Sequence, residues 1–299
     1  MTGVDGRPDQ ATTLPGLSPD QRLLVQQWLP GAHVVADLSW GLIDSTVLRV
    51  RTPGIAEDVI VKACGPGNHH FSRELDAYRH WVGPLRHLGA APVLHHVDAA
   101  ARVLVAEFLP GELVQGHDSE QQPQTYRQAG ALLAAFHGQD RRMDSELGIQ
   151  FNTARKQRAL RWLAGETRIP SATVRRLRAL LADHPTEAVR LVPTHGDYHP
   201  RNWLVHAGHL AVIDFGRAGW RPAQTDLARL AAQQFRTRGD LERAFIEGYG
   251  SDPRGPDWRF ILLTEAIATA AWAYSVGDEA FEAQGHRMIE EALALFPMR

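Results

Sequence analysis

Two short segments in the second half of the chain carry side chains that could hold a metal ion and activate a hydroxyl group. Asp197 is followed five residues later by Asn202, and Asp214 precedes Phe215 and Gly216 at the end of an apolar run. Magnesium prefers oxygen ligands of this kind, and phosphoryl transfer needs a further carboxylate at the incoming hydroxyl. The order and spacing predict a catalytic loop in which Asp197 meets the hydroxyl, and a metal site formed by Asn202 and Asp214.

The same chemistry requires a cation on the α and β phosphates of a nucleoside triphosphate. Lys62 ends the apolar run 59–62, and Glu74 lies on a segment whose apolar residues follow helical spacing from Phe71 onward. A glutamate on that helix would aim the ammonium group at the phosphates. We therefore predict an ion pair between Lys62 and Glu74 and binding of magnesium-bound ATP, with GTP as an open alternative.

A hairpin ahead of the lysine strand is the candidate for closing over the phosphates through its backbone amides. It spans residues 38–46, where Gly41 supplies the turn and Ser45 begins the next strand. With a single glycine the segment is neither a Walker loop nor a dinucleotide fingerprint. Within the catalytic segment, His195 is interpreted as a structural residue packed beneath the loop.

The elements that must position these residues change in character along the chain. The first third predicts a small antiparallel sheet with one helix, because β-branched runs occur at residues 34–38, 45–50, 57–63 and 102–109 and helical spacing occurs at 71–82. The turn at Pro110 and Gly111 marks a boundary. Beyond it the pattern is helical except for strand-like segments at 191–205 and 210–215. The predicted helices are 125–137, 153–164, 171–183 with Ser171 as its N-cap, 225–236, 241–249, 258–276 and 278–295.

These residues resemble the aminoglycoside phosphotransferase and choline kinase-like family, the small-molecule branch of the protein-kinase fold. His-Gly-Asp at 195–197 replaces the His-Arg-Asp of protein kinases, and Gly-Arg-Ala-Gly at 216–219 and Asp-Leu-Ala at 226–228 match the family pattern. The resemblance covers residues 34–232. It implies that Asp226 anchors the catalytic loop, and that the hinge at residues 104–111 binds adenine.

The hinge contacts that the resemblance implies are the Glu107 carbonyl and the Leu109 amide. The fold it implies is a two-lobed α+β kinase-like fold with a small antiparallel-sheet N-lobe and a mainly helical C-lobe. The predicted division is a flexible leader at 1–20, the N-lobe at 21–109, and at 110–299 a C-lobe that also builds the acceptor pocket. Candidate acceptor contacts lie in the C-terminal region: Asp257, Glu265, Trp272, Asp278, Glu279 and Glu282.

The composition of the chain limits which binding partners and which cellular location we expect. The 299 residues are 44% hydrophobic and 22% charged, with a formal net charge of −2, which is ordinary for a globular protein. No basic stripe interleaved with aromatic residues indicates nucleic-acid binding. The apolar stretch 261–276 is too short for a bilayer span, which needs roughly 20 residues, and Cys64 has no cysteine to pair with. We expect a cytoplasmic monomer or homodimer.

The predicted reaction is phosphoryl transfer to a hydroxyl of a small molecule. An antibiotic such as an aminoglycoside or a basic peptide is the first acceptor class, because carboxylates converging on a pocket would suit a polycation. A metabolite such as an amino alcohol or a sugar is the second. A non-catalytic pseudokinase is the alternative from another class, although a binding module has no need for the full residue set. A protein kinase is disfavoured, because no Ala-Pro-Glu and no long activation segment follow Gly216.

Overall fold

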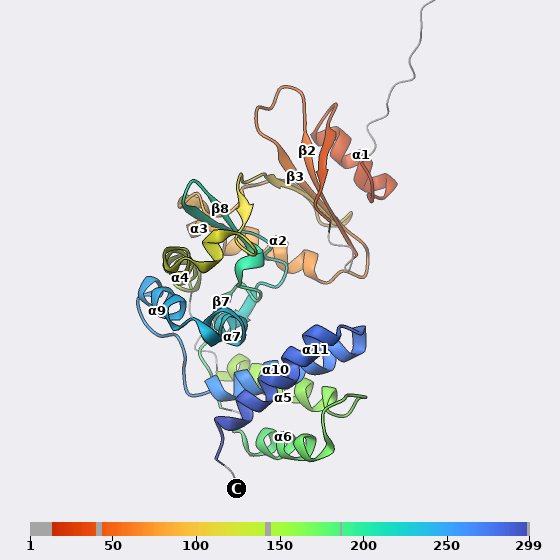
Figure 1. Ribbon diagram of the computed structural model, residues 1–299. Coiled ribbons are helices and arrows are strands. Elements are labelled where there is room, and N and C mark those ends of the chain that lie inside the picture. The colour runs from red at the N-terminus through yellow and green to blue at the C-terminus, as the bar shows by residue number, and fades with distance from the viewer. Residues whose placement is uncertain (1–13, 40–43, 141–144, 186, 298–299) are drawn as a thin grey trace, which may run out of the picture. The chain divides into compact units, whose positions relative to one another are not determined.

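The chain folds into two compact units, and each is built from two separate stretches of sequence. The computed structural model describes residues 14–39, 44–140, 145–185 and 187–297. The first unit comprises Met1–Leu113 and Trp203–Arg217, and the second comprises Val114–Asn202 and Ala218–Arg299 (Figure 1). The sequence analysis assigned everything after residue 109 to the helical lobe. The structure differs for Trp203–Arg217, which belongs to the first unit.

A five-stranded antiparallel sheet forms the centre of the described part of the first unit. Its strand order is β1-β2-β3-β5-β4, with register pairs such as Val47 opposite Lys62 and Lys62 opposite Leu104. The sheet confirms the predicted strand runs, and it adds a strand that the sequence analysis missed. The bounds are β1 His33–Asp37, β2 Ser45–Arg51, β3 Val59–Cys64, β4 Leu94–Asp98 and β5 Val103–Glu107.

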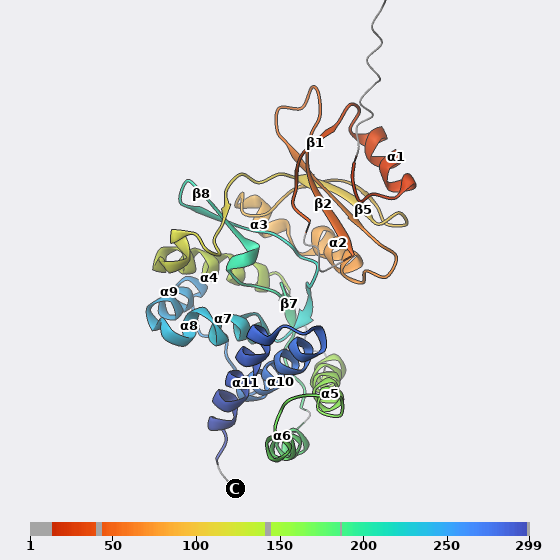
Figure 2. The same cartoon turned by 45° about the vertical axis from the view of Figure 1, so that its right-hand side comes forward.

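Successive side chains of β5 point to opposite faces of this sheet, and each face packs against a different helix. Val103 and Val105 point into a core shared with α1 (Pro19–Trp28), whereas Leu104 and Ala106 point into a core shared with α2 (His70–His80). Successive strand residues face opposite sides of a sheet, so the two helices cover opposite faces (Figure 2). The central strands β3, which carries Lys62, and β5 are therefore covered on both faces.

The segment predicted to be a flexible leader is ordered from residue 14 onward. Leu14 and Leu17 are buried in the core beneath α1. Ser18 caps α1 in a reciprocal capping box with Gln21, which satisfies backbone donors at the helix start. The prediction of a leader at 1–20 was thus wrong for residues 14–20, while residues 1–13 lie outside the described part.

A second, three-stranded sheet completes the first unit. It contains β6 (Glu112–Leu113), β8 (Trp203–His206) and β9 (His209–Val212) in the order β6-β8-β9. The Val212 N–H donates to the Ala90 carbonyl at 2.8 Å, just after the short helix α3 (Gly83–His87). This bond and the β6–β8 pairing hold the late segment against the first part of the chain.

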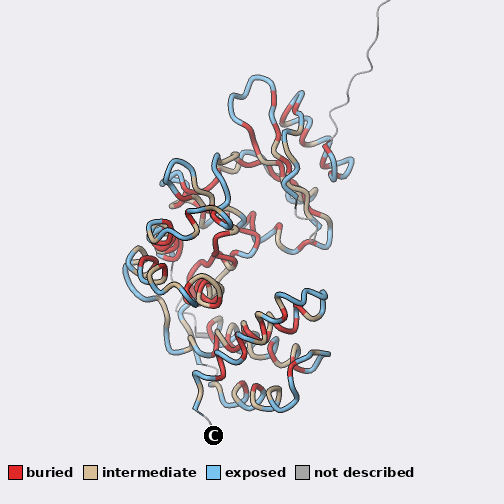
Figure 3. The backbone as a smooth tube through the Cα atoms, in the orientation of Figure 1, coloured by how far each residue is buried: buried red, intermediate tan, exposed pale blue. Residues whose placement is uncertain are grey.

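Helices dominate the second unit, whose packing includes one close helix pair and one cluster shared by four helices. Small residues bring α4 and α9 together, while apolar side chains of α5, α6, α10 and α11 share one buried cluster (Figure 3). Each fully buried apolar side chain of that cluster contributes about 1.5–3 kcal/mol. The α-helix bounds are α4 Pro123–His137, α5 Ser145–Trp162, α6 Ser171–Asp183, α7 Ala228–Ala232, α8 Gln234–Thr237, α9 Gly239–Tyr249, α10 Trp258–Val276 and α11 Glu279–Ala294.

Shorter elements of the second unit frame the segment that contains Asp197. Strand β7 (Val192–Thr194) pairs with β10 (Gly219–Arg221) on either side of it. The 3-10 helices η1 (Asp118–Gln121), η2 (Pro200–Asn202) and η3 (Ala223–Leu227) complete the described elements. Among the described helices of the chain, none is both long and apolar enough to cross a membrane.

Two helix predictions need correction. The expected helix at 225–236 is divided into η3, α7 and α8, because Gln233 adopts a non-helical backbone conformation between α7 and α8. Ser171 is the first residue of α6 rather than its N-cap, and Pro170 occupies the cap position without a side-chain bond.

Candidate active site

The first unit brings one lysine and two carboxylates together. Lys62 lies in β3, and its Nζ is 2.6 Å from Glu74 Oε2 on α2 and 3.1 Å from Asp214 Oδ1 beyond the end of β9. The ion pair predicted between Lys62 and Glu74 is therefore present. The contact with Asp214 adds one of the predicted metal ligands to the same cluster.

Burial and charge act in opposite directions on Lys62. Burial alone would lower the pKa of the amine, but the negative charges of Glu74 and Asp214 outweigh that effect and raise the pKa above its ordinary value. The side chain is therefore a permanent ammonium group at neutral pH. Asp214 keeps 47% of its side chain exposed, so its carboxylate can still reach a ligand.

The backbone around Asp214 is unusual for a residue with a side chain. Its φ angle of 62° lies in the left-handed region, which non-glycine residues seldom occupy. Phe215 beside it is fully buried and meets Tyr78 of α2 edge-on, and the Gly216 carbonyl lies 2.9 Å from His70 Nδ1. These anchors on α2 hold the turn, so Asp214 is locked where Glu74 and Lys62 meet it.

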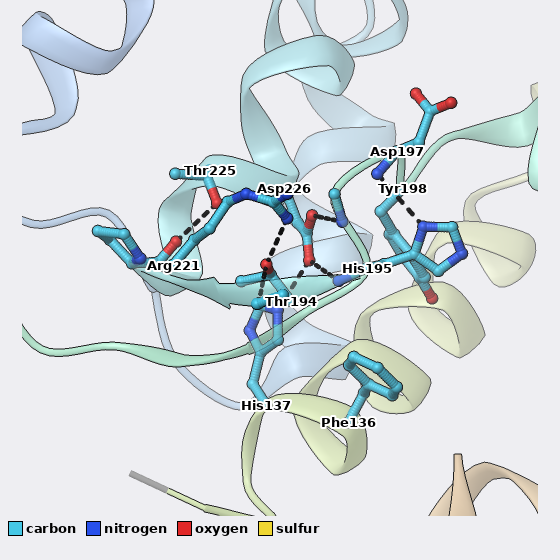
Figure 4. A network of polar contacts seen from close by, with 12 residues as sticks. Phe136, His137, Thr194, His195, Asp197, Tyr198, Arg221, Thr225 and Asp226 are labelled. Carbon is cyan, nitrogen blue, oxygen red and sulfur yellow. Dashed lines mark hydrogen bonds and ion pairs between the residues drawn. The ribbon is translucent and has the colours of Figure 1, made fainter. Parts of the chain in front are cut away.

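In the second unit, Asp226 organises the loop that follows β7. Its carboxylate accepts the backbone N–H groups of His195 at 2.8 Å and Gly196 at 2.6 Å, and it lies 3.0 Å from His137 Nε2 (Figure 4). Burial opposes ionisation, but the hydrogen bonds from His137 and Gly196 outweigh it, and the pKa of Asp226 lies below its ordinary value. Asp226 is thus a buried anion that fixes the loop backbone.

The loop turns at Gly196, whose φ of 81° suits glycine, and presents Asp197 on the other side. Figure 4 shows the Asp197 side chain pointing away from the Asp226 carboxylate. His195 is buried beneath the loop, and its Nδ1 accepts the Asp197 backbone N–H at 3.3 Å. The structural role expected for His195 stays a prediction.

Cationic and aromatic side chains surround Asp197. Oδ1 lies 2.9 Å from Arg229 Nη1 and 3.3 Å from His199 Nε2, and Oδ2 lies 3.2 Å from Arg201 Nη2. Burial lowers the pKa of His199, although the Asp197 carboxylate acts in the opposite direction. His199 is therefore neutral at neutral pH, while both arginines are charged.

Asn202 meets the chemical requirement for a magnesium ligand. Its side-chain Nδ2 donates to the Asp197 carbonyl at 2.8 Å, which orients the amide and leaves its oxygen as the remaining polar atom. Asn202 Oδ1 and the Asp214 carboxylate are both hard oxygen donors of the type that Mg²⁺ prefers. No group of three or more His, Cys, Asp or Glu side chains within the described residues could hold a metal ion. The joint role of Asn202 and Asp214, which belong to different units, stays a prediction.

The predicted nucleotide contacts fall in different parts of the first unit. Glu107 ends β5, and its Oε2 accepts the Val93 N–H at 3.1 Å, which stiffens the chain just before Leu109. Ser45 is the first residue of β2 and is half-buried. Gly41 lies outside the described residues. The roles of Glu107, Leu109 and Ser45 toward a nucleotide stay predictions.

The carboxylates expected to contact the acceptor are engaged with neighbouring residues. Glu265 pairs with Arg155 of α5 at 2.6 Å, and the buried Glu282 pairs with Arg168 at 3.0 Å. Asp257 accepts a hydrogen bond from Asn152 at 3.1 Å. These bonds give the three acids structural roles between elements of the second unit.

The other expected acceptor residues cluster near the start of α11. Asp278 caps that helix by accepting the Phe281 N–H at 2.9 Å, and Glu279 begins it. Trp272 of α10 is 44% exposed and meets the Phe281 ring edge-on at 5.8 Å. Trp272, Asp278 and Glu279 are the members of the set that are exposed.

Sequence reasoning missed two residues of this site. His137 supports Asp226 from the end of α4, and Arg229 reaches Asp197 from α7. The only available signal was position: Arg229 follows Asp226 by three residues, one helical turn, so it lies close to whatever Asp226 anchors.

The comparisons with known proteins agree with this geometry. Residues 34–262 match the model of the phosphotransferase enzyme family, APH, and the chain belongs to that family. Among curated proteins, no match to the sequence was found.

Solved structures of three kinase types share the fold. A thermostable mutant of aminoglycoside phosphotransferase APH(4)-Ia with ADP and hygromycin B has a TM-score of 0.69 at 14% identity, covering 94% of this chain and 100% of that one. A choline/ethanolamine kinase family protein from Mesorhizobium loti has a TM-score of 0.62 at 19% identity, with coverage of 93% and 95%. Macrolide 2'-phosphotransferase MphH from Brachybacterium faecium has a TM-score of 0.62 at 21% identity, with coverage of 92% and 98%. The chain therefore has the kinase-like fold predicted from its sequence.

Proposed function

We propose that this phosphotransferase moves the γ-phosphoryl group of magnesium-bound ATP or GTP onto a hydroxyl of a small molecule in the cytoplasm. The observation that carries the proposal is the contact of Lys62 with both Glu74 and Asp214. An ammonium held between a structural carboxylate and a metal-ligand carboxylate is the arrangement that aligns a triphosphate. A pseudokinase without chemistry would have no need to keep both this cluster and an intact Asp197 loop.

Each residue of the proposed site has one task. Asp197 accepts the proton of the acceptor hydroxyl as the new oxygen–phosphorus bond forms and the bond to the leaving nucleoside diphosphate breaks. Asn202 and Asp214 would hold Mg²⁺, which when bound neutralises charge on the phosphate oxygens. Lys62 binds the α and β phosphates, with Glu74 fixing its direction.

The remaining contacts position the nucleotide. The Glu107 carbonyl and the Leu109 amide would bind the adenine edge. The segment containing Gly41 and Ser45 would cover the phosphates with backbone N–H groups. Strand β5 supports this proposal, because the carboxylate of Glu107 accepts the Val93 N–H and so restrains the backbone at the hinge.

The acceptor proposal starts from an antibiotic, with an amino alcohol or a sugar as the second class. It is supported by structural neighbours that include an aminoglycoside phosphotransferase, a macrolide phosphotransferase and a choline kinase. The carboxylate argument for a polycationic aminoglycoside or basic peptide is weaker than it was from sequence. Glu265 and Glu282 each have an arginine partner, so neither offers an uncompensated charge to an amine.

The test is an ADP-release assay with the full chain against aminoglycosides, basic peptides, macrolides, amino alcohols and sugars, with each product identified by mass spectrometry. Asp197→Ala should reduce turnover by roughly 10²–10⁴-fold, the range for loss of general base catalysis, and leave nucleotide affinity nearly unchanged. Near-normal turnover by this variant would refute the role of Asp197.

The phosphate side of the site is tested by calorimetry. Lys62→Ala and Asp214→Ala should weaken magnesium-dependent nucleotide binding, whereas Lys156→Ala, whose amine donates to carbonyls near the end of α6, should not. The unmodified chain should bind the nucleotide more tightly with magnesium than without it. If magnesium changes its affinity no more than it changes that of Asp214→Ala, the metal assignment is contradicted.

A further inference from the structure

The turn that carries Asp214 is held from α2 by a side chain that the proposed reaction does not use. His70 begins α2, and its Nδ1 lies 2.9 Å from the Gly216 carbonyl oxygen. A carbonyl oxygen only accepts, so the imidazole donates from Nδ1. A Cβ on Gly216 would lie 3.3 Å from both His70 Cβ and Asp214 Oδ1. These three residues therefore lie against one another within the first unit.

Asp214 needs support from outside its own turn. Its φ of 62° lies in a region that costs free energy for a residue with a side chain, and such a conformation persists only where the surroundings impose it. The bond from His70 acts on the backbone two residues after Asp214. It therefore restrains the direction of the Asp214 carboxylate.

Asn68 in turn holds the backbone of His70. Asn68 Oδ1 accepts the His70 backbone N–H at 2.8 Å. Asn68 is 9% exposed, and Arg102 Nη1 donates to its carbonyl at 2.8 Å, which fixes its own backbone. The start of α2 is thus held by a buried amide, whereas the side chain of the N-cap residue His69 makes no capping bond.

The nitrogen of the Asn68 amide reaches the hairpin at residues 38–46, which is expected to cover the phosphates. Nδ2 donates to the Asp44 carbonyl at 3.1 Å, and the Gly65 N–H donates to the same carbonyl at 3.2 Å. Asp44 directly precedes Ser45, where β2 begins. A series of hydrogen bonds therefore connects the hairpin to the turn that carries Asp214, through Asp44, Asn68, His70 and Gly216.

We propose that Asn68 and His70 are positioning residues, which set the hairpin and the Asp214 carboxylate relative to each other. In this role neither touches the reacting atoms. Asn68 acts on the hairpin through the Asp44 carbonyl, and His70 acts on Asp214 through the Gly216 carbonyl. What the hairpin and Asp214 bind rests on the proposed function, whereas the bridge formed by Asn68 and His70 rests on these contacts alone.

The first experiment measures the affinity of the full chain for ATP with and without magnesium. His70→Ala should reduce the magnesium-dependent gain in affinity about tenfold or more, the range for residues that orient a metal ligand, while the affinity without magnesium changes little. His70→Asn should restore most of the gain, because its amide nitrogen is as many bonds from Cα as Nδ1 is. His70→Gln places that nitrogen one bond further away and should not restore it.

His80→Ala is the matched control, because His80 is an exposed histidine at the other end of α2. This variant should behave as the unmodified chain does. A full magnesium-dependent gain in His70→Ala would overturn the role of His70. Equal gains in His70→Asn and His70→Gln would do the same, because the position of the donor would then be irrelevant.

A double variant tests whether the two residues act as one bridge. Asn68→Ala and His70→Ala together should weaken magnesium-dependent ATP binding by less than the product of their separate effects, because residues in one hydrogen-bond network are not independent. Effects that multiply would show that Asn68 acts independently of His70. That result would overturn the bridge.

The second experiment uses the full chain without nucleotide. Amide hydrogen exchange, followed by mass spectrometry, reports local opening of the backbone. Asn68→Ala should speed exchange in the segments 44–48 and 213–217, whereas His80→Ala should alter neither. Unchanged exchange in either segment of Asn68→Ala would overturn the bridge. Faster exchange in both, in a chain whose nucleotide affinity does not depend on magnesium, would refute the proposed function and leave the bridge standing.

Discussion

Asp226 is the residue on which the geometry of the catalytic loop depends. It is 2% exposed and ionised, and its stabilising partners are two backbone N–H groups and His137. A buried charge of this kind is tolerated because its hydrogen bonds replace water. Removing the charge leaves those donors without a strong acceptor.

Asp226→Asn should therefore lower the free energy of unfolding at neutral pH by about 2–4 kcal/mol. The pKa of Asp226 in the folded state lies below its ordinary value of 3.8. Its contribution to the free energy of unfolding is therefore complete above pH 3.8 and is lost as the pH falls through the pKa of the folded state. Urea unfolding at neutral pH and at roughly pH 3 should show the cost of the substitution shrinking in acid.

The matched control is Glu290→Gln, which removes an exposed carboxylate from α11. Its effect should stay within about 0.5 kcal/mol at both pH values. An Asp226→Asn cost no larger than this, or one that persists undiminished in acid, would contradict the account of Asp226.

Single residues were predictable from sequence where the chemistry demanded a partner. Lys62 and Glu74 could be paired because a phosphate-binding cation needs an orienting carboxylate, and the ion pair is present. His137 and Arg229 could not be found this way. Their contacts depend on how α4 and α7 pack against the loop, which no local pattern encodes.

At the scale of elements, the contact between α4 and α9 depends on glycines from both helices. A Cβ on Gly130 of α4 would lie 2.1 Å from the Phe245 carbonyl oxygen, and one on Gly248 of α9 would lie 1.9 Å from the Arg127 carbonyl oxygen. Those distances allow no side chain, and the opposing atoms are backbone. The two helices must therefore separate if either position gains a methyl group.

Gly130→Ala and Gly248→Ala should each destabilise the second unit by about 2–3 kcal/mol, the cost of overpacking a tight contact. Gly239→Ala is the control, because a Cβ at the start of α9 meets nothing within 4 Å. This control should be neutral or slightly stabilising, since alanine favours the helix over glycine. Calorimetric unfolding compares the three variants, and equal midpoints would refute the close-packing account.

Elements with strong local signals were predicted from sequence, and those set by tertiary contacts were not. The bounds of α10 follow its long apolar pattern, and the structure agrees at 258–276. Strand β4 was missed because His95 and His96 interrupt its apolar residues, and it forms by pairing with β5. Helix α1 was missed although Ser18 and Gln21 carry a capping-box signature.

At the scale of the whole molecule, the first unit is assembled from two distant stretches of chain. Leu113 of β6 lies opposite Leu204 of β8 in antiparallel register. The intervening stretch Val114–Asn202 belongs to the second unit. This division was not predicted from the sequence, because the boundary was drawn from the turn at Pro110 and Gly111 alone.

The antiparallel register gives a testable design. A fragment that joins residues 14–113 to 204–217 through an Asn-Gly turn keeps Leu113 opposite Leu204 and should fold with a cooperative thermal transition, because this turn suits a tight β-hairpin. Residues 14–113 alone should unfold less cooperatively and at lower temperature. Circular dichroism compares the two, and equal melting of both fragments would show that the late segment adds nothing to the first unit.

Because the first unit is built from two separate stretches of sequence, its parts are synthesised at different times on the ribosome. The N-terminal sheet is translated first, yet the strand partner of β6 and the turn that carries Asp214 leave the exit tunnel only after the whole of Val114–Asn202. Translation proceeds from the N-terminus at about 5–20 residues per second. For several seconds, therefore, Lys62 and Glu74 have been synthesised but their third partner, Asp214, has not. The nascent chain therefore cannot assemble the cluster of Lys62, Glu74 and Asp214 until the first of the two stretches of the second unit has already been made.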